Sequence, residues 1–265
     1  PMKRALRTQR LETIAEAQSK DVAVRIAYAD KHANIANSWK KWQGESLGLE
    51  HLGTIEKKQR YEAAFADWAA DKPQYAALLD SMRAAYASNT KGYFVRELFN
   101  ESMGAIEAYG IARKLRQATS ATAEEQLAFR RKLLKDYNKE IDRTIARQML
   151  TEFMARMPKE SIPQELTAGI NSRGGIQEYI DSLYNNTKIL GNDTLSANKL
   201  LADPMLVFEG IFDEIVKQKR AYTYRNISNV PAIEKWYTTY MQALREWDKE
   251  RAFYPDANFT LRVAY

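Results

Sequence analysis

Apolar side chains return every three or four positions along most of this chain, which restricts it to a helical architecture. The clearest stripe lies in residues 230–252, and it consists of Ile233, Trp236, Tyr237, Tyr240, Met241, Leu244 and Trp247. We therefore predict an all-α fold. The expected helices cover residues 3–19, 21–42, 46–70, 74–88, 91–117, 122–157, 174–186, 204–223 and 230–252.

The longest of these predicted helices runs from Thr122 to Met157. Its start resembles a capping box, because Glu125 follows Thr122 by three residues, and Pro158 ends it. A helix of this length spans about 50 Å at about 1.5 Å per residue, which is more than a compact bundle needs. The sequence thus predicts an irregular, multi-helix cap or arch domain with some long helices.

The last residues follow a different pattern. From Asn258 onward the side chains alternate strictly, with Phe259, Leu261, Val263 and Tyr265 on one face, which is the period of a β-strand. No comparable strand precedes it, although its backbone needs a hydrogen-bonding partner. We therefore expect residues 1–252 to form a helical domain, and residues 253–265 to be a handover turn and the first, orphan strand of a β-barrel domain in a longer parent protein.

Composition excludes several classes of function. The chain has no cysteine, so disulfides, thiolate nucleophiles and cysteine metal sites are ruled out. Its net charge of +6 comes from 40 basic and 34 acidic residues that are interleaved, as on solvated helix faces, and no basic stripe with exposed aromatic residues predicts nucleic-acid binding. No run of about eighteen apolar residues predicts a membrane span.

The sequence proposes no catalytic centre of its own. Its two histidines, His32 and His51, belong to no metal-ligand motif, and no Gly-x-Ser-x-Gly nucleophile segment occurs. Nothing suggests a triad, a metal site or a cofactor.

Two groups of residues nevertheless resemble a known family, serine peptidase family 46, which contains the dipeptidyl peptidases 7 and 11. The first group covers roughly residues 250–265, with the wording Tyr254-Pro255-Asp256-Ala257-Asn258 followed by Thr260-Leu261-Arg262. The second covers roughly residues 22–70, and consists of Tyr28-Ala29, Asn37-Ser38-Trp39-Lys40, Gly44, Gly48-Leu49 and Phe65-Ala66-Asp67-Trp68.

The resemblance implies that the catalytic residues lie in another domain of the parent protein. In that family a chymotrypsin-like double β-barrel carries the catalytic His, Asp and Ser, and a helical domain inserted between the barrel halves covers the cleft, so that dipeptides leave from a free N-terminus. The expected partners of this chain are then an oligopeptide substrate and the barrel of its own parent, in the periplasm or cell envelope. The chain alone is expected to be inactive. Preference for a hydrophobic or an acidic second substrate residue is set in the second barrel and cannot be read here.

The resemblance also points to candidate substrate contacts. Asn37 matches the family's asparagine that helps to bind the α-ammonium group of the peptide, and an amide oxygen can accept a hydrogen bond from an ammonium. Trp39 is a weaker candidate for a wall of the site, with core packing as its other reading. The pattern departs at Lys41-Trp42, where relatives tend to carry an asparagine and a small residue, so the local shape of the cleft is expected to differ.

A free-standing helical binding module is the alternative function, because apolar stripes would also serve partner recognition. The terminal strand discriminates between the two, since a binding module needs it only to extend a partner's sheet. An unpaired strand could also pair with a second copy of the chain, which leaves a homodimer open.

Overall fold

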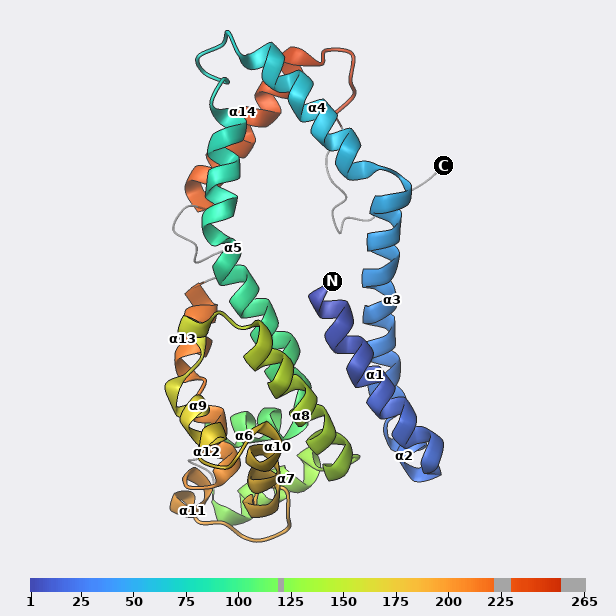
Figure 1. Ribbon diagram of the computed structural model, residues 1–265, viewed down its shortest axis with the longest axis vertical. Coiled ribbons are helices and arrows are strands. Elements are labelled where there is room, and N and C mark those ends of the chain that lie inside the picture. Colours follow the sequence, from blue (N-terminus) through green and yellow to red (C-terminus); the bar gives the residue numbers. More distant parts are fainter. Residues whose placement is uncertain (119–121, 222–229, 254–265) are drawn as a thin grey trace. The chain divides into compact units, whose positions relative to one another are not determined.

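The computed structural model describes residues 1–118, 122–221 and 230–253, and this part of the chain consists of helices and their connections, without a strand. The predicted all-α class is confirmed (Figure 1). The predicted orphan strand at 258–265, and nearly all of the handover segment 253–265, lie outside the described residues. No described helix is both long and apolar enough to cross a bilayer.

The helices have the following bounds: α1 Met2–Lys20, α2 Val22–Ala27, α3 Ala29–His51, α4 Thr54–Ala69, α5 Leu78–Ser102, α6 Glu107–Gln117, α7 Ala123–Leu133, α8 Lys139–Arg156, α9 Gln164–Asn171, α10 Ile176–Asn186, α11 Ala197–Leu201, α12 Pro204–Gly210, α13 Asp213–Ala221 and α14 Val230–Trp247. Two short 3₁₀ turns, η1 Met103–Ala105 and η2 Lys159–Ser161, follow α5 and α8. The longest helix, α5, has 25 residues and so spans about 37 Å.

These helices form two compact units. The larger unit comprises Pro1–Gly48 and Thr90–Thr223, and the smaller comprises Leu49–Asn89 and Tyr224–Tyr265. The divisions therefore fall near the end of α3 and within α5, so each of these helices contributes to both units.

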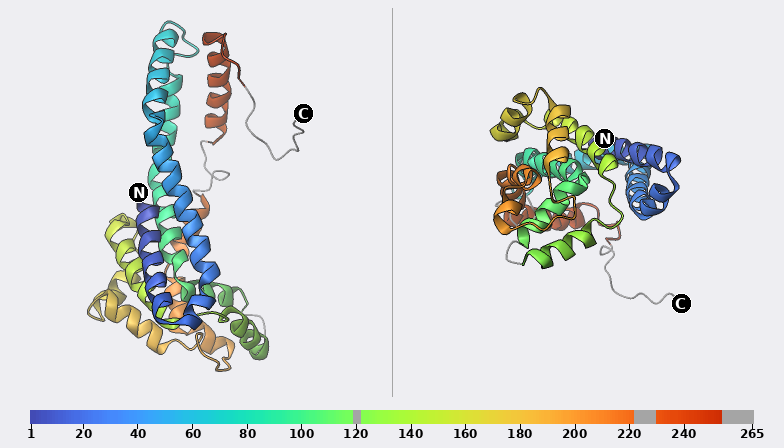
Figure 2. Two further views of the ribbon diagram at one scale, coloured as in Figure 1. Left: turned by 90° about the vertical axis from the view of Figure 1, so that its right-hand side faces the viewer. Right: turned by 90° about the horizontal axis from the view of Figure 1, so that it is seen from below.

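The core of the larger unit is built where α6, α8, α10 and α12 pack together, with α1 lying along α8. Aromatic side chains meet edge to face at its centre, where the Phe212 ring lies 5.2 Å from Phe208, 5.6 Å from Phe153 and 5.9 Å from Tyr109. Such contacts add stability beyond the burial of the rings themselves. In the same unit α1 and α3 run side by side in opposite directions (Figure 1, Figure 2).

The smaller unit has its own, mainly aromatic core. Phe65 on α4 is fully buried, and its ring lies 5.2 Å from Tyr240 and 5.7 Å from Trp247 on α14. Ile233, Tyr240 and Leu244, three members of the stripe read from the sequence, are buried, whereas Tyr237 is 52% exposed.

The prediction of one long helix over residues 122–157 is wrong. The segment divides into α7 and α8, because Asp136 adopts a left-handed conformation with φ 59° and the Asn138 side chain caps a new helix by accepting from the N–H groups of Glu140 and Ile141. The two predicted ends are confirmed, since Thr122 and Glu125 form a capping box and α8 stops at Arg156, just before Pro158.

Other boundaries also differ from the sequence-based prediction. The expected helix 21–42 divides at Tyr28 into α2 and α3, and α3 continues to His51, across the expected break between residues 42 and 46. The expected helix 204–223 divides into α12 and α13. The expected break between residues 88 and 91 is absent, since α5 continues through it. The short helices α9 and α11 were not predicted, because eight and five residues show too little periodicity.

Candidate functional site

Helix α3 carries both residues predicted to face a substrate, and it has one packed side and one open side. Tyr28, just before its start, is buried, and Lys31, Ile35, Trp39 and Trp42 are all partly buried. These positions recur every three or four residues, so they share one side of the helix at about 100° per residue. This side faces the body of the larger unit, because Ile35 packs against its core.

Asn37 lies on the open side. It is exposed, and it stands roughly opposite Ile35 and Trp39, two residues away from each along a helix with about 100° per residue. Its side-chain amide makes no hydrogen bond to any residue that the structure describes. Ala33 lies one turn before it and the exposed Lys41 one turn after it, and a Cβ atom at Gly44, two turns on, would meet nothing within 4 Å. The amide is therefore accessible to a group outside this unit.

Trp39 has a structural contact. Its indole N–H donates a hydrogen bond to Thr8 Oγ1 on α1 over 2.9 Å, and this ties the middle of α3 to α1. Trp42, one of the two departures from the family pattern, also turns toward α1, where Lys3 Nζ lies 5.0 Å from the centre of its ring. Lys41 stays exposed and pairs loosely with Glu45 over 3.8 Å. Of the two departures, only the added charge of Lys41 therefore stands on the exposed surface.

A buried carboxylate lies near the start of α3. Asp142 on α8 is fully buried and accepts four hydrogen bonds: from the backbone N–H of Glu107 at 2.6 Å and of Ala108 at 2.8 Å, and from the hydroxyls of Tyr137 at 3.0 Å and Tyr184 at 2.7 Å. The residue before α6, Ile106, has no side chain that can cap the helix. Asp142 therefore caps α6 from another helix, and its charge also interacts favourably with the helix dipole.

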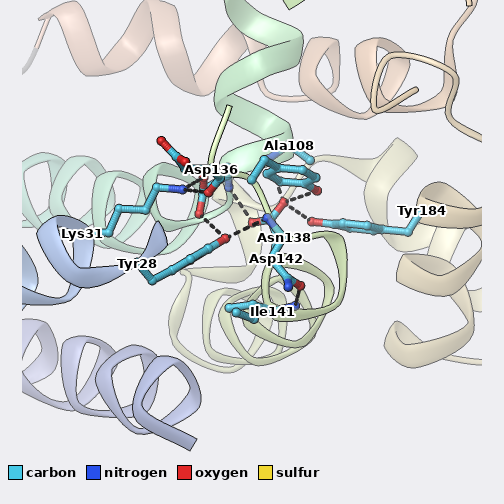
Figure 3. Close-up of polar contacts among 10 residues, drawn as sticks. Tyr28, Lys31, Ala108, Asp136, Asn138, Ile141, Asp142 and Tyr184 are labelled. Atoms are coloured by element: carbon cyan, nitrogen blue, oxygen red, sulfur yellow. Dashed lines mark hydrogen bonds and ion pairs between the residues drawn. The ribbon is translucent and has the colours of Figure 1, made fainter. Parts of the chain in front are cut away.

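A second layer of contacts connects this carboxylate to α3 (Figure 3). The Tyr28 hydroxyl donates to Glu107 Oε1 over 3.0 Å and accepts from the N–H of Asn138 over 3.1 Å. Lys31 Nζ donates to Glu107 Oε2 over 2.7 Å and to the carbonyl of Asp136 over 2.8 Å. We call Tyr28, Lys31, Glu107, Asn138 and Asp142 the anchor network of α3.

Burial controls the electrostatics of this network. Desolvation raises the pKa of Asp142 to about 6, although its four donors favour the ionised form. Burial, together with neighbouring Glu107 and Asp142, raises the pKa of Tyr28, so its hydroxyl keeps its proton and can donate. Burial lowers the pKa of Arg10, which lies on α1 and is attracted by Glu107 and Asp142.

The contacts described above are hydrogen bonds and ion pairs that hold α3 against the larger unit. Among the described residues, no cluster of three or more His, Asp or Glu could hold a metal ion. His32 and His51 both lie on α3, nineteen positions apart in the sequence and so about 28 Å apart along the helix.

Sequence reasoning missed the anchor network for a definite reason. Reading residues 122–157 as one helix placed Tyr137 on an apolar stripe and gave Asp142 no role. The signal that could have revealed the break is Asn138 with Glu140 in the following turn, since asparagine is a favoured N-cap and acidic residues favour the first turn. Tyr28 belongs to the Tyr28-Ala29 motif that resembles the family, but its spacing in the sequence does not indicate a partner on α6.

Comparisons with known proteins come from both sequence and structure. The family model described as Peptidase S46 matches residues 1–265. Dipeptidyl-peptidase 7 of Porphyromonas gingivalis is 28% identical over 267 residues, which cover 94% of this chain and 37% of that protein. An Asp/Glu-specific dipeptidyl-peptidase of Flavobacterium psychrophilum is 27% identical over 292 residues, which cover 100% of this chain and 40% of that protein.

Solved structures share the fold. The crystal structure of DPP11 from Porphyromonas endodontalis matches with a TM-score of 0.77 and 20% identity, over 98% of this chain and 40% of that one. A crystal structure of the same enzyme in complex with the dipeptide Arg-Glu matches with a TM-score of 0.71 and 18% identity, over 93% of this chain and 38% of that one. The chain thus spans about two fifths of the length of the relatives it matches.

Proposed function

Because the chain belongs to the peptidase S46 family, we propose that it is the helical part of a serine-type dipeptidyl peptidase. The observation that carries the proposal is the family match over residues 1–265, together with relatives named as dipeptidyl peptidases that align along nearly the whole chain. In this proposal a β-barrel elsewhere in the parent protein supplies the catalytic His, Asp and Ser, and the parent acts in the periplasm or cell envelope.

The reaction would be acyl transfer through the barrel serine, with an oxyanion hole stabilising the tetrahedral intermediate. The helical domain contributes by covering the cleft and closing it beyond the second substrate residue. Only a free N-terminus then fits, and a dipeptide is the acyl group that the serine receives. That an S46 relative is known in complex with the dipeptide Arg-Glu supports a peptide as the substrate class.

Asn37 is the residue of this chain that we assign to substrate. Its amide oxygen would accept a hydrogen bond from the α-ammonium group of the peptide, and the amide itself has no pKa in the working range to compete. Its exposed position on the open side of α3 supports this role. Trp39, by contrast, is engaged with Thr8, which favours its structural reading over a direct substrate contact.

The first experiment compares the full parent protein with the isolated chain on dipeptidyl aminomethylcoumarin substrates. The parent should release the fluorophore and be inhibited by a serine-directed phosphonate, whereas the isolated chain should release none. An inactive parent that nevertheless folds and binds another protein would favour the helical binding module instead.

The second experiment replaces Asn37 by alanine in the parent. Losing a hydrogen bond to a charged group costs about 1.5–3 kcal/mol, so kcat/KM should fall roughly 10- to 150-fold, mainly through a higher KM. The matched control is Asn198→Ala, which changes another exposed asparagine, on α11. Equal kinetics for both variants would remove Asn37 from the site.

A further inference from the structure

Helix α3 is held in place by few contacts, although it carries the candidate substrate residue. None of its residues from Ala29 to His51 is fully buried. Beyond the anchor network, the contacts on its packed side include the partly buried Ile35, the neutral hydrogen bond from Trp39 to Thr8, and Lys3 over the ring of Trp42. A helix with so little buried surface depends on specific contacts to stay in one position.

The anchor network provides the most directional of these contacts. The Lys31 and Glu107 side chains are only 30% and 21% exposed, and their ion pair is a charge-assisted hydrogen bond of 2.7 Å. Tyr28 is buried and bridges two partners, Glu107 on α6 and the N–H of Asn138 at the start of α8. The first turn of α3 is therefore tied to two other helices at once.

Glu107 is itself fixed in place. Its backbone N–H donates to Asp142, which also holds Ala108 and two tyrosine hydroxyls from within the core. The carboxylate of Glu107 thus extends from a helix end that cannot shift without breaking buried hydrogen bonds. A rigid support of this kind is what a binding residue needs in order to be held within a fraction of an ångström of its productive place.

We propose that Tyr28, Lys31 and Glu107 are positioning residues that act through α3 to fix where Asn37 presents its amide. The inference rests on the proposed function of Asn37. Lys31 lies six residues before Asn37, or about 9 Å along the helix axis, so Lys31 is not itself the contact to the ammonium group of the substrate. A rigid α-helix transmits its position over that distance, and loss of the Lys31 contacts lets the helix shift or tilt.

The test is a double-mutant cycle in the full parent protein, on a dipeptidyl aminomethylcoumarin substrate. Lys31→Met should raise KM about tenfold and leave kcat within about twofold, because the reacting groups are untouched. In the Asn37→Ala background the same substitution should raise KM by less than about twofold, because the residue that it positions is gone. Lys31→Arg, which keeps the positive charge and N–H donors for a charge-assisted bond to Glu107, should raise KM less than Lys31→Met does.

Two further variants separate positioning from general loss of structure. Lys20→Met removes a lysine that pairs with Glu16 on the exposed side of α1, and its KM should stay unchanged. Tyr28→Phe removes one hydroxyl and leaves the buried ring, so it should raise KM in the same manner even where Lys31→Met fails to fold. Its effect should likewise disappear in the Asn37→Ala background.

The results distinguish the proposed substrate contact of Asn37 from the proposed positioning role of Tyr28, Lys31 and Glu107. If Asn37→Ala raises KM but the Lys31 and Tyr28 variants do not, the positioning role is overturned and the role of Asn37 stands. The same conclusion follows if the fold increase in KM of each double variant equals the product of the increases of its two single variants. If Asn37→Ala leaves KM unchanged, the proposed function of Asn37 and the positioning role both fail.

Discussion

The two units of this chain are stabilised by different kinds of core. In the larger unit, seven polar or charged residues are buried alongside the apolar ones: Ser102, Gln126, Arg130, Asp142, Thr187, Asp203 and Glu209. In the smaller unit, every buried side chain that the structure describes is apolar or aromatic, with the rings of Phe65, Trp68, Tyr75, Tyr240 and Trp247 in contact. Buried polar groups therefore help to hold the helices of the larger unit together, whereas apolar and aromatic packing alone forms the described core of the smaller unit.

The difference matters because hydrogen bonds have direction and apolar contacts do not. Asp203, for example, accepts from Thr187 Oγ1 at 2.6 Å, from the N–H of Lys188 at 2.7 Å and from the N–H of Met205 at 2.9 Å, and so it fixes the loop after α10 against the start of α12. Buried polar groups of this kind define one arrangement and are costly to leave unpaired. We expect the unit that presents Asn37 to lose more from a polar substitution, and the aromatic unit to lose more from a change of volume.

The largest expected effect is that of Asp142→Ala. It leaves two backbone N–H groups and two tyrosine hydroxyls without their acceptor, and each unpaired buried group costs about 1–3 kcal/mol, so the larger unit should lose about 4 kcal/mol or more. Hydrogen exchange should show lost protection in α6 and α8 but not in α4 and α14. Asp80→Ala, at a side chain that is 79% exposed, is the control. Equal loss in both units would contradict the comparison.

A somewhat smaller effect, confined to the other unit, is expected for Phe65→Ala. Removing a fully buried ring from the aromatic core leaves a cavity, and such changes cost about 3–5 kcal/mol. Amides of α4 and α14 should exchange faster, while those of α8 should keep their protection. The control is Phe94→Ala, since that ring is 37% exposed. Comparable losses from the two phenylalanines would show that Phe65 is not a core residue.

The smallest of the three effects is a pH dependence that comes from one buried carboxylate of the larger unit. The pKa of Asp142 is raised by burial to about 6, so between about pH 4 and pH 6 the folded protein binds more protons than the unfolded chain. Stability from this group is thus highest at low pH and falls as pH rises through that window, by roughly 3 kcal/mol.

Exchange of α8 amides at a series of pH values, corrected for intrinsic rates, measures this dependence. Asp142→Asn is the control, because it keeps the size of the side chain and removes the titration. A wild-type profile as flat as that of the variant would mean that the carboxylate does not titrate in this range.

The sequence predicted the apolar core of the smaller unit better than the polar contacts of the larger unit. The stripe from Ile233 to Trp247 follows from helical periodicity, and most of it forms the aromatic core of the smaller unit. The break at Asp136 and the bond from Tyr28 to Glu107 did not follow, because a left-handed residue and a hydrogen bond across 79 positions leave no period in the sequence. The position of Asn37 came from resemblance to a family, and its exposure on the open side of α3 could be known only from the structure.

The most direct test of the central claim is a crystal structure of the full parent protein with a dipeptide bound in its cleft. The account predicts that Asn37 Oδ1 lies within hydrogen-bonding distance, about 2.7–3.2 Å, of the α-ammonium nitrogen, with Lys31 still paired to Glu107. A dipeptide whose ammonium group is bound entirely by other residues, with Asn37 facing solvent, would contradict it.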